Sequence, residues 1–123
     1  MHKSAGLTLI ELLVVMALLA ILASIAVPRY LDRVEQARET VLKQNLHGLR
    51  TAIDQYYRDK AKYPDNLQIL ADERYIRAVP EDPMTQRTDT WVIVPPKNGG
   101  TQVFDVKTSS TELSKEGVAY ASW

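Results

Sequence analysis

Residues 7–27 read LTLIELLVVMALLAILASIAV, and this apolar run decides the fold of the chain. As an α-helix it extends about 31 Å, which matches the thickness of the hydrocarbon core of a bilayer. One carboxylate, Glu11, interrupts the run near its start. A carboxylate in a membrane helix is costly and usually has a partner and a functional role. The run therefore predicts a membrane-spanning helix that carries one functional polar residue.

Three simpler explanations of the run do not account for Glu11. A secretory signal peptide has a shorter, uncharged apolar region, although Ser24-Ile25-Ala26 resembles a cleavage site. A buried core helix is excluded because a chain of 123 residues has no core large enough to cover it. A plain membrane anchor is favourable, since its aliphatic side chains contribute about −4 to −8 kcal/mol to insertion and the carboxylate opposes this by at most about 3 kcal/mol. The anchor leaves the carboxylate without a partner.

The residues around the start of the run resemble a known processing signal. A short polar leader, Met1–Gly6, ends in glycine; Leu7 to Glu11 follow, and Pro28 comes directly after the aliphatic residues. This order resembles the class III signal of type IV pilins and type II secretion pseudopilins. The resemblance implies that a prepilin peptidase cuts between Gly6 and Leu7 and that Leu7 is then N-methylated. The new α-ammonium group would supply the partner that Glu11 lacks, although the family usually has Phe where this chain has Leu7.

After Pro28 the pattern remains helical but becomes amphipathic. Charged residues of both signs are interleaved through residues 29–62, and apolar residues recur three or four positions apart from Leu31 to Tyr56. Residues 7 to about 60 are therefore predicted to form one helix of about 80 Å. Pro28 removes one backbone hydrogen bond and predicts a kink there, with a helix start at the membrane surface as the alternative.

The remainder of the chain predicts a small cap that covers the amphipathic half. Local patterns predict that the long helix ends at Tyr63-Pro64 and that a short helix follows within Asn66–Glu73. Two strands are then predicted, Trp91–Val94 and Gln102–Val106, with a turn between them at Asn98-Gly99-Gly100. A short last strand is predicted within Gly117–Trp123. A sheet this small must bury one face, and the stripe from Leu42 to Tyr56 is predicted to receive it.

The expected fold class is α+β, with a long N-terminal helix packed against a small antiparallel C-terminal sheet, as in pilins. The expected organisation has four segments: a cleaved leader (1–6), a transmembrane and filament-core helix (7–28), its amphipathic continuation (29–62) and a small soluble α/β cap (63–123).

The second half of the chain resembles the major pseudopilins of type II secretion. The shared landmarks are Ile53–Tyr57, Tyr63-Pro64, Leu67–Leu70, Tyr75-Ile76 and Pro80–Pro83. Such proteins often bind one calcium ion in a C-terminal loop. The corresponding loop of this chain, Lys107–Gly117, has only Glu112 and Glu116 as acids, with Lys107 and Lys115 beside them. Calcium takes six to eight oxygen ligands, often including several carboxylates. The pattern favours a solvated loop and no cofactor, with calcium as the remaining alternative.

Composition limits the function classes. Fifteen basic and fifteen acidic residues cancel, so no global field attracts nucleic acid. The chain has no cysteine, whereas adhesive surface pilins commonly carry a C-terminal disulfide loop. His2 lies in the leader, His47 has no neighbouring ligand in the sequence, and no phosphate loop or nucleophile motif is present. We therefore expect a protein that is not an enzyme.

The resemblance implies a structural subunit of a type II secretion pseudopilus in the bacterial inner membrane, with a single membrane pass and the C-terminal domain in the periplasm. The implied partners are other copies of the chain, minor pseudopilins, the prepilin peptidase and the inner-membrane assembly platform. Glu11 would act in assembly by pairing with Leu7 of a neighbouring copy. The alternative is a type IV pilin or a competence pseudopilin that binds a ligand or DNA. Arg58, Lys60 and Lys62 surround Asp59 and form a poor basic patch, so nucleic acid is not expected.

Overall fold

The computed structural model describes residues 6–123, so residues 1–5 of the predicted leader lie outside the described part. Its elements are α1 (Leu9–Lys60), α2 (Leu67–Asp72), β1 (Val92–Val94), β2 (Asp105–Lys107) and the 3₁₀-helix η1 (Tyr120–Ser122). The chain divides into two compact units, Met1–Ala37 and Arg38–Trp123. Helix α1 contributes residues to both units.

In the first unit, α1 is formed by the apolar run and begins two residues later than predicted, at Leu9. It continues through Pro28, so the alternative of a helix start at that proline is wrong. Proline has no N–H group, which leaves the Ser24 carbonyl without its helical donor. The kink at Pro28 stays a prediction.

The apolar side chains of this unit are exposed around the whole helix. Leu7 is 77% exposed, Ile10 is 70% exposed and Leu22 is 63% exposed. Among the described residues, α1 is one helix that is long and apolar enough to cross a membrane. A helix that is apolar on all sides has to be covered by lipid or by other apolar helices.

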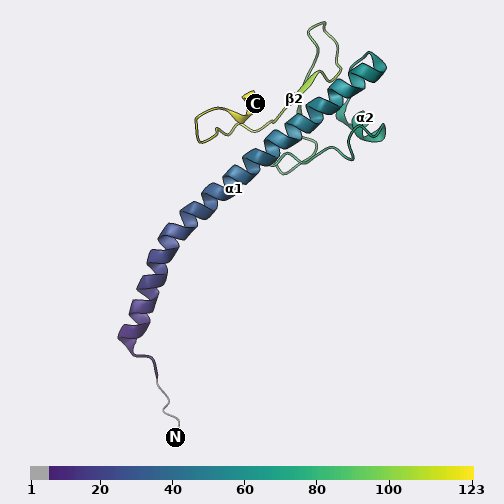
Figure 1. Ribbon diagram of the computed structural model, residues 1–123. Helices are drawn as coiled ribbons and strands as arrows, with labels where there is room; N and C mark the ends of the chain where they lie inside the picture. The colour runs from purple at the N-terminus through teal and green to yellow at the C-terminus, as the bar shows by residue number, and fades with distance from the viewer. Residues whose placement is uncertain (1–5) are drawn as a thin grey trace. The chain divides into compact units, whose positions relative to one another are not determined.

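In the second unit, α1 buries the predicted stripe. Its buried residues are Leu42, Leu46, Leu49, Ala52, Ile53 and Tyr56. The residues that pack against this stripe are Leu67 and Leu70 of α2, Trp91, Val103, Val106 and Tyr120. Figure 1 shows α2 and the sheet beside this part of α1. The α+β fold class and the seat of the sheet are thereby confirmed.

The short helix α2 follows directly from its capping residue. Asn66 lies just before the helix with an extended backbone, and its side-chain oxygen accepts a hydrogen bond from the Ile69 N–H at 3.0 Å. This satisfies one of the free N–H groups of the first turn. The predicted helix within Asn66–Glu73 is confirmed.

The two strands pair antiparallel, with Ile93 opposite Val106, but β2 begins later than predicted. The cause is Val103, whose side chain is fully buried and whose N–H donates to the Pro64 carbonyl at 2.8 Å. This contact takes Val103 out of the sheet. The segment Asn98-Gly99-Gly100 lies in the connection between the two paired strands, which confirms the predicted antiparallel hairpin, with a connection longer than predicted.

The predicted last strand is also wrong. Residues Tyr120–Ser122 form η1, and Ala119 makes only an isolated bridge to Leu113. The tight turn allows the Tyr120 side chain to enter the core, where it is 1% exposed. It also brings the Trp123 ring edge-on to Tyr120, with 4.8 Å between the ring centroids. Aromatic burial thus decides the local structure over strand pairing.

The hydroxyl group of Tyr75 donates to the Asp59 carboxylate at 2.6 Å, and this hydrogen bond, with partial burial and the negative charge, raises the pKa of Tyr75 to about 12. The bond needs the protonated phenol. Its contribution to stability is therefore complete below the pKa of about 10 expected in the unfolded chain and is lost as the pH rises through 12.

We expect Tyr75→Phe to remove one tyrosine from the late part of a phenolate-absorbance titration, and Asp59→Asn to move that ionisation back toward pH 10. A Tyr75→Phe titration that differs from wild type only near pH 10 would contradict this assignment.

Candidate functional site

Thr8 and Glu11 form a reciprocal pair at the start of α1. The Thr8 N–H donates to Oε2 of Glu11 at 2.9 Å, and the Glu11 N–H donates to Oγ1 of Thr8 at 3.2 Å. This arrangement is a capping box, in which a hydroxyl and a carboxylate three residues apart satisfy free N–H groups at a helix start. The negative charge also lies at the positive end of the helix dipole. Glu11 therefore has a role within a single copy of the chain.

This capping role was missed by sequence reasoning, although its signal was present. Thr8-Leu9-Ile10-Glu11 fits the pattern of Thr followed three residues later by Glu, which predicts a helix start. The same residues belong to the processing signal, and they were interpreted only as part of that signal. The box also explains why α1 begins at Leu9 rather than at Leu7.

The predicted cleavage residues lie just before the helix. Gly6 and Leu7 are both exposed and non-helical, so a peptidase can reach the peptide bond between them. A Cβ atom added to Gly6 would meet no described atom within 4 Å. The fold therefore does not itself require glycine at this position, and a requirement for glycine has to come from another molecule.

The structure brings Leu7, Thr8 and Glu11 together at one helix end. Pro28 lies far along the same helix, so it belongs to no common site with them. His47 is exposed on α1. Within residues 6–123, no three His, Cys, Asp or Glu side chains gather in a group that could hold a metal ion.

Comparisons with known proteins agree with this N-terminal site. The prokaryotic N-terminal methylation motif matches residues 1–27. The type II secretion system core protein G of Vibrio cholerae is 30% identical to the chain, and the match covers 91% of this chain and 86% of that protein. The chain belongs to this core protein G family.

Two further relatives carry the same name. The protein from Klebsiella pneumoniae is 28% identical over 96% of this chain and 94% of its own length. The protein from Pseudomonas aeruginosa is 39% identical, but this match covers 56% of this chain and 49% of that protein. No solved structure matches the chain significantly.

Family membership indicates where each part of the chain lies in the cell. This core protein G is a pseudopilin, a structural and non-enzymatic component of type II secretion. The apolar part of α1 crosses the inner membrane, and the second unit lies in the periplasm. The exposed aliphatic side chains of the first unit are therefore a surface for lipid and for neighbouring helices.

Proposed function

We propose that this pseudopilin polymerises through residues 7–28 after the leader 1–6 is removed, with Glu11 setting the register between copies. The observation that carries the proposal is the capping box at the start of an apolar helix that nothing in its own unit covers. The four-segment organisation follows from it: a leader, a filament-core helix, an amphipathic continuation (29–62) and a cap (63–123).

The capping box leaves Glu11 able to bind a second partner. Its Oε2 atom accepts the Thr8 N–H. The other oxygen of the carboxylate, Oε1, can therefore accept a hydrogen bond from a second donor. Cleavage after Gly6 creates an ammonium group on Leu7. In a filament, the ammonium group of a neighbouring copy would reach Oε1 without disrupting the helix start.

An ion pair in this position would fix the stagger between neighbouring membrane helices. Apolar helices slide past one another with little change in free energy, because lipid and side chains are equally apolar. A carboxylate that loses its ammonium partner in a medium of low dielectric constant pays a desolvation penalty of several kcal/mol (about 3–5 when one partner of a buried pair is removed). Only the stagger that pairs the two charges is then favourable.

The same proposal assigns the partners. Other copies of the chain and minor pseudopilins would contact the apolar helix, the prepilin peptidase would cut between Gly6 and Leu7 and methylate Leu7, and an inner-membrane assembly platform would receive the processed subunit. The exposed, non-helical backbone at residues 6–8 supports the peptidase step, because a protease needs an extended substrate.

Processing is the first test of this proposal. We expect the intact mass of the protein purified from membranes to correspond to a chain that begins at Leu7 and carries one methyl group. The Gly6→Leu variant is expected to retain its leader, because a cleft that selects glycine has no room for a larger side chain. Its own fold has space for that side chain.

The outcomes are distinct. A mature N-terminus at Val27 would mean that ordinary signal peptidase acts, and the membrane helix and the filament would both be lost. Full processing of Gly6→Leu would contradict the role of Gly6 in cleavage. As a matched control, Gly48→Ala changes an exposed glycine of α1 without steric conflict and should leave processing unchanged.

A further inference from the structure

A buried carboxylate lies where the C-terminal loop meets the rest of the second unit. Asp82 is fully buried, and its two oxygens accept different donors: Oδ1 accepts the Met84 N–H at 2.8 Å and Oδ2 accepts the Thr108 hydroxyl at 2.5 Å. Thr108 is itself 1% exposed. The carboxylate therefore joins the turn after Pro80 to the first residue that follows β2.

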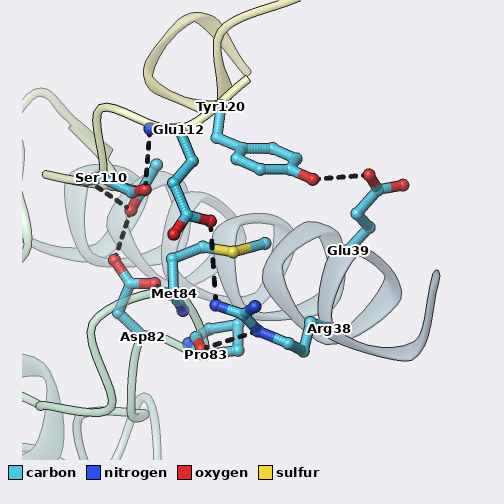
Figure 2. Close-up of polar contacts among 9 residues, drawn as sticks. Arg38, Glu39, Asp82, Pro83, Met84, Ser110, Glu112 and Tyr120 are labelled. Atoms are coloured by element: carbon cyan, nitrogen blue, oxygen red, sulfur yellow. Dashed lines mark hydrogen bonds and ion pairs between the residues drawn. The ribbon is translucent and has the colours of Figure 1, made fainter. Parts of the chain in front are cut away.

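Hydrogen bonds continue from Thr108 along the loop. The Thr108 hydroxyl oxygen accepts the Ser110 N–H at 3.1 Å, and the Ser110 hydroxyl oxygen accepts the Glu112 N–H at 3.2 Å. Figure 2 shows this line of contacts running from Asp82 through Ser110 to Glu112. Successive donors and acceptors fix the backbone of the loop from its buried end.

Helix α1 holds the outer end of the same loop. The guanidinium group of Arg38 donates to the Pro83 carbonyl at 3.4 Å and lies 3.9 Å from the Glu112 carboxylate. The Glu39 carboxylate accepts the Tyr120 hydroxyl at 2.6 Å, as Figure 2 shows. We call this set the clasp; its members are Arg38, Glu39, Asp82, Thr108, Ser110, Glu112 and Tyr120.

The donor set of the loop does not fit a calcium ion. Calcium needs six to eight oxygens, usually with carboxylates among them. Three backbone carbonyls in or next to the loop, those of Glu112, Ser114 and Val118, already accept backbone N–H groups. The Glu112 carboxylate faces Arg38.

Glu116, the second acid of the loop, lies near positively charged side chains. It lines a hollow of about 260 Å³ together with Lys43 and Arg50. These two cations oppose the entry of a divalent cation. The expected solvated loop is only partly confirmed, because Thr108 and Ser110 are buried while the stretch around Glu116 is exposed.

We propose that the clasp closes the C-terminal loop in place of a calcium ion, so that this pseudopilin folds independently of calcium. Protein groups supply every function that a metal would have there. Asp82 anchors the buried end, and Arg38 balances the charge of Glu112 at the exposed end.

Thermal unfolding of the full chain in detergent micelles tests the calcium part. Both tryptophans, Trp91 and Trp123, belong to the second unit, so their fluorescence reports its unfolding. We expect the midpoints in about 5 mM calcium chloride and in excess chelator to agree within about 1 °C. A calcium site with the affinity typical of extracellular modules would raise the midpoint by about 5–10 °C and would overturn the proposal.

Two substitutions of one residue test the clasp. Thr108→Val keeps the shape of the side chain but leaves a buried carboxylate oxygen and the Ser110 N–H without partners, and we expect it to lower the midpoint by about 5–15 °C. Thr108→Ser keeps the hydroxyl group and should retain most of the wild-type midpoint. Equal midpoints for Thr108→Val and wild type would show that the clasp does not hold the loop.

Two carboxylate variants complete the experiment. Glu116→Gln lies in the same loop but outside the clasp, and it should leave the midpoint unchanged with or without calcium. Should Thr108→Val fail to fold, Glu112→Gln at the exposed edge is expected to lower the midpoint by a few degrees without creating a calcium response. A calcium-dependent midpoint in wild type that either glutamine variant abolishes would assign the loop to a metal site instead.

Discussion

We expect Glu11→Leu to abolish assembly into filaments while the periplasmic unit folds as in wild type. The substitution makes insertion of the helix more favourable, because it removes a charge from the apolar run. On the proposed pairing, it also removes the acceptor for the ammonium group of a neighbouring copy. Loss of one partner of such a pair in a low-dielectric medium costs about 3–5 kcal/mol, which should reduce assembly at least about a hundredfold.

Because Glu11 also caps its own helix, the experiment needs variants that separate the effect of its charge from the effect of its capping hydrogen bond. Glu11→Gln keeps an acceptor for the Thr8 N–H, since glutamine also serves in capping boxes, but it has no negative charge. Thr8→Val removes the hydroxyl that accepts the Glu11 N–H and leaves the carboxylate in place. If register depends on charge, Glu11→Gln fails as Glu11→Leu does, whereas Thr8→Val assembles.

Disulfide cross-linking in cells measures this directly. The chain contains no cysteine, so one cysteine introduced at Ala17 in the apolar run reports contacts between copies without background. With this cysteine present, wild type and Thr8→Val should give disulfide-linked dimers, because one thiol per copy forms one disulfide, and both Glu11 variants should give monomers. Dimers from Glu11→Gln together with their loss in Thr8→Val would mean that Glu11 acts only as a helix cap.

The second large effect concerns the seat of the sheet on α1. We expect Leu49→Ala to lower the free energy of unfolding by about 2–5 kcal/mol, because Leu49 is 1% exposed and its removal leaves a cavity under the sheet. Urea unfolding of the full chain in detergent, followed by tryptophan fluorescence, measures the change.

A matched control lies on the same helix. Val41 is 42% exposed, and Val41→Ala should change the free energy of unfolding by less than about 1 kcal/mol. Similar losses for both variants would mean that Leu49 contributes no more packing under the sheet than an exposed residue does, since alanine favours the helix at both positions.

The parts of the structure that the sequence predicts are those with a strong local period. The apolar run and the stripe from Leu42 to Tyr56 follow directly from helical spacing, and both appear in α1. Helix α2 was predicted within Asn66–Glu73 from its apolar residues, and the structure adds that Asn66 caps it. In each case the residues that determine the element lie within one or two helical turns of each other.

The errors come from contacts between residues far apart in the sequence. Tyr120 leaves the predicted last strand because its hydroxyl donates to Glu39, 81 positions away. Val103 leaves the predicted return strand because its N–H donates to Pro64. No local pattern records either partner, so strand propensity was overridden by tertiary hydrogen bonds and burial.

Arg50 was missed for the same reason. In the sequence it is one charged residue among many on an amphipathic helix. In the structure it donates to the Asp105 carboxylate at 2.7 Å, to the Val106 carbonyl at 3.0 Å and to the Trp123 carbonyl at 2.7 Å. It therefore ties β2 and the last residue to α1. Its fork of donors suits several acceptors at once, which a pattern of charges does not reveal.

The exposed aliphatic surface of the first unit has a kinetic consequence. Each copy of the chain is confined to the plane of the bilayer by this surface, so copies meet by lateral diffusion in two dimensions. Their helices share one polarity before any contact forms, and much of the translational and rotational entropy of association is lost at insertion. Confinement raises the effective concentration of one copy near another. If Glu11 pairs with Leu7 of a neighbouring copy as proposed, a weak contact between helices with this single charge pair would then suffice for growth.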